Sequence, residues 1–524
     1  MCIRDSFDSQ YQSQINQALP NLNLPSDPDP NHPLTRPITL TELTTNLKKT
    51  NQKSAPGPDL ITYLVIRNFP PIANNILINL YNAILTRAYI PSQFKRSTTI
   101  LIPKPNKDHT QLTSYRPITL NSTLAKLFEK ILARRLNTFA IINNIIKPHQ
   151  TAFRPNMDTS HNILHFFQQT VTAFNNNKLT LQVNFDIKQA FDRTWHNGLL
   201  HTIHTNTNLH FTKIIHAFLT NRVINVQIDN HKHDQTITPT QGVPQGSPIS
   251  PILFNIFTST APITPDNAST HMYNYADDFS FTSISNTPSA AWSDLKPHIE
   301  DFINWTKKHR LPLQHNKTQT TFFTRKRSIP TTDYPIIYID SHYIPRSTVS
   351  TLLGVTLDTH LTLQQHIKKI NTGTHHTINQ IRTIMNRNKH IPTFIGALLY
   401  KTLIRTKFTY ANPILTIIKP TTWRTLQHTE NKALRAATRR GIRTNINTLH
   451  ALTKIKPLTD YYTDISQQTL RRIITNHNEH LTNTLFNTTR KRGIAFWTPP
   501  LDNTFQSFSH QHQTDLHNIL NDNT

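Results

Sequence analysis

Cysteine, glycine and acidic side chains are scarce in this chain. Its 524 residues include one cysteine, nine glycines, and 29 Asp and Glu against 55 Lys and Arg, for a formal net charge of +26. The single cysteine, Cys2, excludes a disulfide framework and a zinc site built on several thiolates. No apolar run approaches the roughly 18 residues that a membrane-spanning helix needs. A strongly basic surface attracts membranes or nucleic acid, and we therefore favour nucleic acid and expect no membrane partner.

The residue bias itself indicates a G-poor coding strand. Residues with G-initial codons (Gly, Val, Ala, Glu, Asp) are scarce, whereas Thr, Asn, His, Ile and Gln are abundant. We interpret the 29 histidines as drift in base composition, because none stands in a His-Glu-x-x-His or similar ligand pattern. Under this interpretation, Gly242 and Gly246 within one short loop are unlikely to be accidental.

Three carboxylates stand at the ends of predicted strands. Apolar and polar residues alternate along Leu181–Asp186, and again on both sides of Tyr275-Ala276-Asp277-Asp278. The second pattern predicts a tight hairpin with the acidic pair at its turn, where Asp tolerates positive φ. Alone, that pair is more simply a solvated turn. If the strand ending at Asp186 is adjacent, three negative charges gather, and hard oxygen ligands suit Mg²⁺.

An ordered series of motifs resembles the reverse transcriptases of jockey-type non-LTR (LINE-like) retrotransposons. The resemblance runs from about Leu40 to about Arg440. Any one motif is weak, but the ordered set is specific. In chain order, the motifs are Ala55-Pro56-Gly57-Pro58-Asp59, Ile102-Pro103-Lys104-Pro105, Ser114-Tyr115-Arg116-Pro117-Ile118, Phe185-Asp186, Ala190-Phe191-Asp192, Thr194-Trp195-His196, Gly242-Val243-Pro244-Gln245-Gly246-Ser247, Tyr275–Asp278 and Leu353-Gly354-Val355.

The resemblance implies an α/β fold of the right-hand polymerase type, with fingers, a palm of antiparallel sheet and helices, and a helical thumb. We expect an extended N-terminal linker over 1–39, fingers and palm over 40–358, the thumb over 359–443, and an unassigned tail over 444–524. No endonuclease domain is expected in this sequence, and residues 1–6 have the look of a cloning scar. The basic face of the predicted helix over 124–136, formed by Lys126, Lys130, Arg134 and Arg135, lines a template groove or is solvated.

The same resemblance implies the reaction and its residues. A DNA primer is extended on an RNA template by nucleotidyl transfer, with two Mg²⁺ ions (Mn²⁺ as an alternative) held by Asp186, Asp277 and Asp278. Lys317 protonates the leaving pyrophosphate. Residues implied to bind the nucleotide are Lys104, Arg116, Gln245, Gly246 and Phe191, the last as a steric gate against the 2′-hydroxyl or else a core residue. Residues implied to contact nucleic acid are Arg154, Gly354, Lys432, Arg435 and Arg439.

Other functions stay open from the sequence. A catalytically inactive, retrotransposon-derived RNA-binding protein is the main alternative, and survival of every carboxylate disfavours it, since Asp→Asn needs one G-to-A change. A group II intron or telomerase-like reverse transcriptase and a purely structural basic protein fit less well. The expected partners are RNA template, DNA primer or target DNA, and deoxynucleoside triphosphates. We expect an intracellular protein of nucleus and cytoplasm, with no targeting signal in the sequence. Template, target site and oligomeric state are not specified.

Overall fold

The computed structural model describes residues 8–22, 26–104, 108–111, 114–228, 231–264, 269–326, 329–387, 390–415, 418 and 420–475. The chain divides into two compact units that interleave along the sequence. Unit 1 comprises Met1–Arg154, Phe185–Ile263 and His298–Lys317, and unit 2 comprises Pro155–Asn184, Thr264–Pro297 and Thr318–Thr524. No helix of the described residues is long and apolar enough to cross a bilayer.

Unit 1 combines a four-stranded sheet with helices. The strand order is β2-β1-β4-β5, in which β1 pairs antiparallel with β2 and parallel with β4. Its strands are β1 (Arg96–Pro103), β2 (Tyr115–Asn121), β4 (Val223–Ile228) and β5 (His231–Ile237). Its helices are α1 (Ser9–Ala18), α2 (Leu40–Lys48), α3 (Tyr63–Arg67), α4 (Pro71–Arg87), α5 (Thr123–Ile142), α7 (His196–Asn206), α8 (Leu209–Leu219) and α9 (Ser250–Thr258), with short 3₁₀ turns at Ser92–Lys95 and His315–Lys317.

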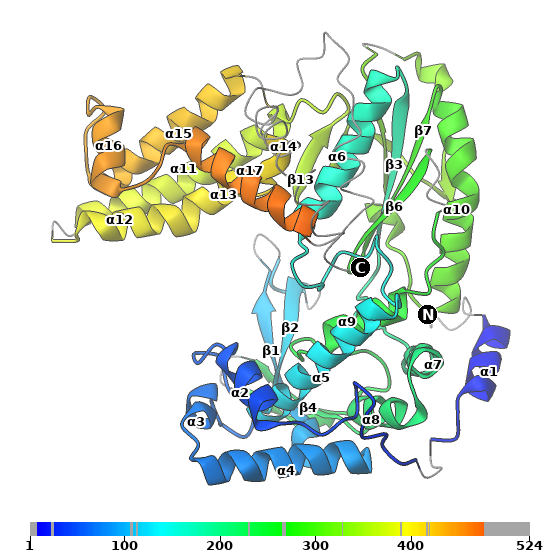
Figure 1. Ribbon diagram of the computed structural model, residues 1–524. Helices are drawn as coiled ribbons and strands as arrows, with labels where there is room; N and C mark the ends of the chain where they lie inside the picture. Colours follow the sequence, from blue (N-terminus) through cyan, green and yellow to red (C-terminus); the bar gives the residue numbers. More distant parts are fainter. Residues whose placement is uncertain are drawn as a thin grey trace, which may run out of the picture. The chain divides into compact units, whose positions relative to one another are not determined.

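Unit 2 is built on a five-stranded sheet of order β11-β8-β3-β7-β6 and a helical bundle. Helix α6 packs on β6 and β7 (Figure 1). The strands are β3 (Leu179–Asp186), β6 (Thr270–Tyr275), β7 (Asp278–Ser285), β8 (Gln319–Phe323), β9 (Tyr338–Ile339), β10 (His342–Tyr343), β11 (Arg346–Ser347), β12 (Val349–Leu352) and β13 (Val355–Asp358). The helices are α6 (Thr159–Asn175), α10 (Pro288–Lys308), α11 (Gln364–Arg387), α12 (Thr393–Tyr400), a π-helical turn (Lys401–Arg405), α13 (Thr406–Thr409), α14 (Asn412–Leu415), α15 (Pro420–Thr438), α16 (Ile446–Thr453) and α17 (Leu458–Thr475). Strand β3 and helix α10 each continue from one unit into the other.

The mixture of sheets and helices confirms the predicted α/β class. The helices from α11 onward share one apolar core, and α16 and α17 contribute Leu449, Leu458 and Tyr462 to it. The helical region predicted to end at residue 443 therefore continues through Thr475. Residues 476–524 and the suggested scar at 1–6 lie outside the described part of the chain.

Helix α4 shows where periodicity alone misplaces a buried face. Apolar residues at helical spacing over Ile72–Tyr89 predict one apolar face with Ile76, Leu77, Leu80, Ile84 and Leu85, yet Ile76 and Leu80 are exposed. Leu77 and Tyr81 are buried instead, with Ile84 and Leu85 completing the stripe. Successive helical residues are about 100° apart, so a face centred on Leu77 and Tyr81 turns the two preceding positions toward solvent.

The N-terminal segment is packed, which differs from the predicted extended linker. Helix α1 begins at an N-cap, where the Asp8 carboxylate accepts a hydrogen bond of 2.8 Å from Tyr11 N. Farther along, Leu34 and Ile38 are buried. The abundance of Pro, Asn and Asp predicted an extended segment, but long-range contacts decide the outcome.

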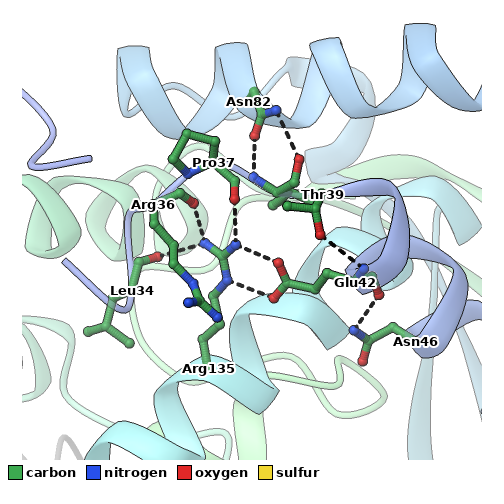
Figure 2. Close-up of polar contacts among 9 residues, drawn as sticks. Leu34, Arg36, Pro37, Thr39, Glu42, Asn46, Asn82 and Arg135 are labelled. Atoms are coloured by element: carbon green, nitrogen blue, oxygen red, sulfur yellow. Dashed lines mark hydrogen bonds and ion pairs between the residues drawn. The ribbon is translucent and has the colours of Figure 1, made fainter. Parts of the chain in front are cut away.

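Arg135 of α5 holds that segment in place (Figure 2). Its guanidinium donates to both carboxylate oxygens of Glu42, at 2.8 and 2.6 Å, and to the carbonyl oxygens of Leu34, Arg36 and Pro37. The side chain of Arg135 is 4 % exposed and that of Glu42 is 18 % exposed. The hypothesis that the basic face of α5 is solvated or lines a groove is therefore wrong for Arg135.

Two lysines of the same face have structural partners as well. Lys130 Nζ donates to Lys49 O at 2.8 Å, and Lys126 Nζ donates to Ala55 O at 3.4 Å. Arg134 remains exposed. Three of the four cations on this face thus bind carbonyl groups of the chain between Leu34 and Ala55.

Candidate active site

A two-residue turn joins β6 to β7. Tyr275 pairs with Asp278, so Ala276 and Asp277 form the turn and Asp278 is the first residue of β7. The positive φ of 57° falls on Ala276, whereas the sequence analysis assigned it to the acidic pair. Asp277 is half-buried and Asp278 is exposed.

Two asparagines that the sequence analysis missed support this turn. Asn274 Nδ2 donates to Ala276 O at 3.1 Å, and Asn162 Nδ2 of α6 donates to Asn274 O at 3.1 Å. Both side chains are buried. Asn274 alternates with two tyrosines along the strand, and that alternation predicted a solvent-facing side chain, so the sequence held no signal of its burial.

Asp186 closes β3 and forms an ion pair with Lys317 Nζ in unit 1. The backbone explains this meeting of residues far apart in sequence. Gln314 N donates to Asp186 O at 2.9 Å, and Ile187 pairs with Leu313 as an antiparallel bridge. The segment before Lys317 therefore lies beside the end of β3. The 3₁₀ turn His315–Lys317 then places Lys317 next to the carboxylate of Asp186.

Two of the three predicted carboxylates, Asp186 and Asp278, belong to strands of the five-stranded sheet, and Asp277 lies in the turn before β7. Strand β3, which ends at Asp186, lies next to β7, which begins at Asp278, in the five-stranded sheet. Gln182 of β3 donates to Ser280 Oγ of β7 at 3.0 Å. Asp186 belongs to unit 1 and the turn carboxylates to unit 2. Across the described residues, no three His, Cys, Asp or Glu side chains form a group that could hold a metal ion, so the three-carboxylate site stays a prediction.

The loop Gly242–Ser247 is fixed by backbone bonds to the segment after Asp186. Val243 N donates to Phe191 O and Gly242 N donates to Thr194 O, each at 2.8 Å. Gly242 has φ +82°, and a Cβ there would lie 2.5 Å from Asp192 O. Glycine is thus required at this position by contact with the chain itself.

Gly246 and Gln245 join the same loop to β2. Thr119 N donates to Gln245 O at 2.9 Å. Gly246 has φ +114°, and a Cβ there would lie 2.5 Å from Thr119 O. The expectation that these glycines allow close approach to a nucleotide remains a prediction, because the close approach seen is to protein backbone.

Phe191 rests on an aromatic cluster. Its ring stacks on Phe254 of α9, with centroids 4.7 Å apart and planes at 21°, and meets Phe153 edge-on at 6.2 Å. Phe191 is half-buried, whereas Phe254 is fully buried. One face of the ring is therefore covered by Phe254, and the choice between a steric gate and a core residue stays a prediction.

A buried acid beneath the loop was not anticipated. Ser247 Oγ donates to Glu129 Oε2 of α5 at 2.5 Å, and Arg222 Nη2 donates to Gly242 O at 2.8 Å. Burial raises the pKa of Glu129 from 4.5 to about 7, against the lowering effects of the Ser247 hydrogen bond and the charges of Lys126 and Arg222. Glu129 shares the helix face of buried Ala125 and Leu132, and that spacing was the signal.

The remaining nucleotide-binding candidates meet at one end of the β1–β2 hairpin. Arg116 of β2 pairs with Ile102 of β1, and Lys104 N donates to Ser114 O at 2.8 Å just beyond. Arg116 is exposed and Lys104 is half-buried. The hairpin thus brings together two cations that lie 12 residues apart in sequence.

The residues predicted to contact nucleic acid differ in their hydrogen-bond partners and exposure within the protein. Arg154 Nη1 donates to Lys147 O and Gln150 O, Arg435 donates to Thr444 O, and Arg439 donates to Ile391 O at 2.9 Å. Lys432 is exposed on α15. Gly354 has φ +84°, and Tyr410 lies against it, with the Tyr410 hydroxyl donating to Leu353 O.

Comparison with known proteins matches the central region of the chain to a family model. Residues 102–357 match the family model described as reverse transcriptase (RNA-dependent DNA polymerase). The probable RNA-directed DNA polymerase from transposon BS of Drosophila melanogaster is 28% identical over 408 residues, covering 77% of this chain and 45% of that protein. The RNA-directed DNA polymerase from mobile element jockey of Drosophila melanogaster is 30% identical over 339 residues, covering 64% and 36%. The chain thus spans less than half the length of these curated relatives.

Among solved structures, apo telomerase from Candida tropicalis resembles the chain with a TM-score of 0.40 and 13% sequence identity. That similarity covers 80% of this chain and 71% of the telomerase chain.

Proposed function

We propose that this chain, whose residues 102–357 form a reverse transcriptase domain, is the polymerase part of a jockey-type non-LTR retrotransposon. It extends a DNA primer on an RNA template. The observation that carries the proposal is the match of residues 102–357 to the reverse transcriptase family model. The ordered motifs and the two Drosophila relatives support the same activity.

Reverse transcriptases in general depend on divalent metal ions, and we assign Mg²⁺, with Mn²⁺ as an alternative, to Asp186, Asp277 and Asp278. Carboxylate oxygens are the donors that Mg²⁺ prefers. Asp186 already attracts a cation, Lys317, and the two side chains are 27 % and 61 % exposed. Exposed ion pairs contribute at most about 1 kcal/mol, so a metal ion can displace the lysine. When bound, two ions stabilise the attacking primer oxygen and the leaving pyrophosphate.

Side chains of the protein select the nucleotide, hold its triphosphate and donate the proton. Phe191 excludes a ribose 2′-hydroxyl, and Lys104 and Arg116 hold the triphosphate. Lys317, released from Asp186, donates a proton to the pyrophosphate oxygen as negative charge develops there. Phosphoryl transfer needs chiefly positioning and charge neutralisation, which agrees with the lack of a dedicated nucleophile.

The net charge of +26 supports nucleic-acid partners. We assign the template, primer and target strands to surfaces that carry Lys432, Gly354 and the arginines Arg154, Arg435 and Arg439. Each of these arginines already donates a hydrogen bond to a carbonyl oxygen of the chain. A retrotransposon polymerase would act in the nucleus and cytoplasm.

An inactive RNA-binding protein is the second candidate. The net charge of +26 supports nucleic-acid binding whether or not the chain is catalytic. The two candidates differ in a single measurable property, the incorporation of nucleotides.

Primer extension on RNA and DNA templates, with the purified chain and Mg²⁺, separates them. We expect extension on both templates and none after Asp277→Asn or Asp186→Asn. Fluorescence anisotropy should show nearly unchanged primer–template affinity for both variants, because phosphate contacts elsewhere dominate binding. If either variant retained more than a few per cent of extension, the carboxylate assignment would be wrong. Binding without extension by the unmodified chain would establish the second candidate.

A further inference from the structure

We propose that Asp192 is a positioning residue that fixes the side-chain amide of Gln245, so that its oxygen faces the incoming nucleotide. Asp192 directly follows the candidate gate residue Phe191, and Gln245 belongs to the glycine loop. The inference rests on the proposed polymerase function and adds to it a determinant of nucleotide affinity.

The contact is a fork between an amide and a carboxylate. Gln245 Nε2 lies 2.9 Å from Oδ1 and 3.0 Å from Oδ2 of Asp192. Both residues are half-buried. Burial raises the pKa of Asp192, while the hydrogen bond from Gln245 and the charge of Arg193 lower it. The amide therefore stabilises the ionised form of the acid that holds it.

The chemistry of the pair determines which end of the amide points outward. An ionised carboxylate only accepts hydrogen bonds, whereas a glutamine amide has one donor end and one acceptor end. The NH₂ group must therefore face Asp192, and Oε1 must face the opposite side. An asparagine at position 192 would accept either orientation, because it carries a donor and an acceptor itself. Aspartate selects one orientation where its amide isostere would not.

The backbone around the pair is held independently of it. Val243 N bonds to Phe191 O, Gly242 N bonds to Thr194 O, and Thr119 N bonds to Gln245 O. A change at Asp192 should therefore rotate the Gln245 amide without moving the loop. Phe191 and Gln245 stand on this common frame, so the sugar gate and the presented oxygen keep a fixed relation.

The test is single-nucleotide incorporation by the full chain on a primer–template with one dNTP. We expect Asp192→Asn to raise the KM for the dNTP about tenfold, because losing one hydrogen bond weakens binding by about that factor. The kcat should stay within about twofold of that of the unmodified chain. Gln245→Glu should be worse, because it sets two carboxylates against each other. The double variant D192N/Q245E should recover most of the KM, since the introduced amide can donate to the introduced carboxylate and an oxygen again faces outward.

Asp464→Asn, at an exposed carboxylate paired with Lys456, serves as the matched control and should leave the KM unchanged. Thermal melting of each variant should match that of the unmodified chain. A KM unaltered in Asp192→Asn, or a double variant no better than the single variants, would overturn the inference while leaving the polymerase function standing. An unmodified chain that incorporates nothing would refute the proposed function, and this inference with it.

Discussion

The ammonium group of Lys317 forms an ion pair with the carboxylate of Asp186, although 131 residues separate them. The two residues were chosen from different motifs, one for metal binding and the other for proton donation. Backbone pairing between Ile187 and Leu313 brings the two segments together. Lys317 and the predicted metal ligand Asp186 belong to the same unit. Their contact supports the proposed role of Lys317 in proton donation.

Replacing Lys317 should slow the chemical step. Arg keeps the charge but stays protonated, so it cannot donate a proton, and Leu removes both properties. We expect single-turnover incorporation to fall for both variants, by at least about tenfold for Leu, since a positioned general acid contributes about 10²–10⁴-fold. Primer–template affinity should change little.

Lys456→Leu is the matched control for Lys317, because it removes a similarly exposed lysine that is paired with Asp464. Its incorporation rate should equal that of the unmodified chain. Rates within about twofold of unmodified for both Lys317 variants would rule out the role in proton transfer.

Phe191→Ala should admit ribonucleotides, because the ring that would meet the 2′-hydroxyl is gone. The variant also loses the stacking on Phe254, and half-burial places its cost at about 2–3 kcal/mol, below that of a fully buried phenylalanine. The measurement is the ratio of rNTP to dNTP incorporation by one preparation. Phe153→Ala, which removes only an edge contact with the same ring, should leave the ratio unchanged. Equal ratios in all three proteins would show that Phe191 is a core residue.

Arg135→Leu should strongly destabilise unit 1, whereas Arg134→Leu should not. Arg135 is buried and holds Glu42 together with three carbonyl groups, so its loss leaves Glu42 without its ion-pair partner. Breaking a buried ion pair costs about 3–5 kcal/mol. Denaturant unfolding measures the difference between the two variants. Equal losses of unfolding free energy in the two variants would show that the ion pair of Arg135 with Glu42 adds no stability of its own.

Glu129 should make stability depend on pH in a defined window. Its pKa is about 7 in the folded chain and near 4.5 when unfolded, so the folded state binds the proton more tightly. Its contribution is therefore most favourable below pH 4.5 and is lost as the pH rises to about 7 and above, by roughly 3 kcal/mol in all.

Glu129→Gln isolates this effect, because Gln keeps the shape and can accept from Ser247. The variant should gain stability relative to the unmodified chain as the pH rises from 4.5 to 8. The groups that face Glu129 and remain in the variant include Ser247, Lys126 and Arg222, together with Tyr63 and Tyr81. Parallel curves of unfolding free energy against pH would show that Glu129 titrates normally.

The sequence by itself determined the local elements and the order of the motifs. Alternation over Leu181–Asp186 predicted β3, and the stripe from Leu124 to Leu136 predicted α5, because burial of one face leaves a period in the sequence. The hairpin around Asp277 was expected for the same reason. Side-chain period and turn chemistry act over a few residues, so they can be read without the fold.

Only the tertiary structure decided which polar groups meet. In the sequence, Arg135 is one of four cations on a helix face. None of its neighbours in sequence indicated that it pairs with Glu42, which is 93 residues away. Likewise, Ser247 and Glu129 are 118 residues apart, and Gln245 and Asp192 are 53 apart. Periodicity states which face of an element is buried but not what lies against it. Hydrogen bonds and ion pairs form over about 3 Å, so their partners are fixed only when distant segments pack together.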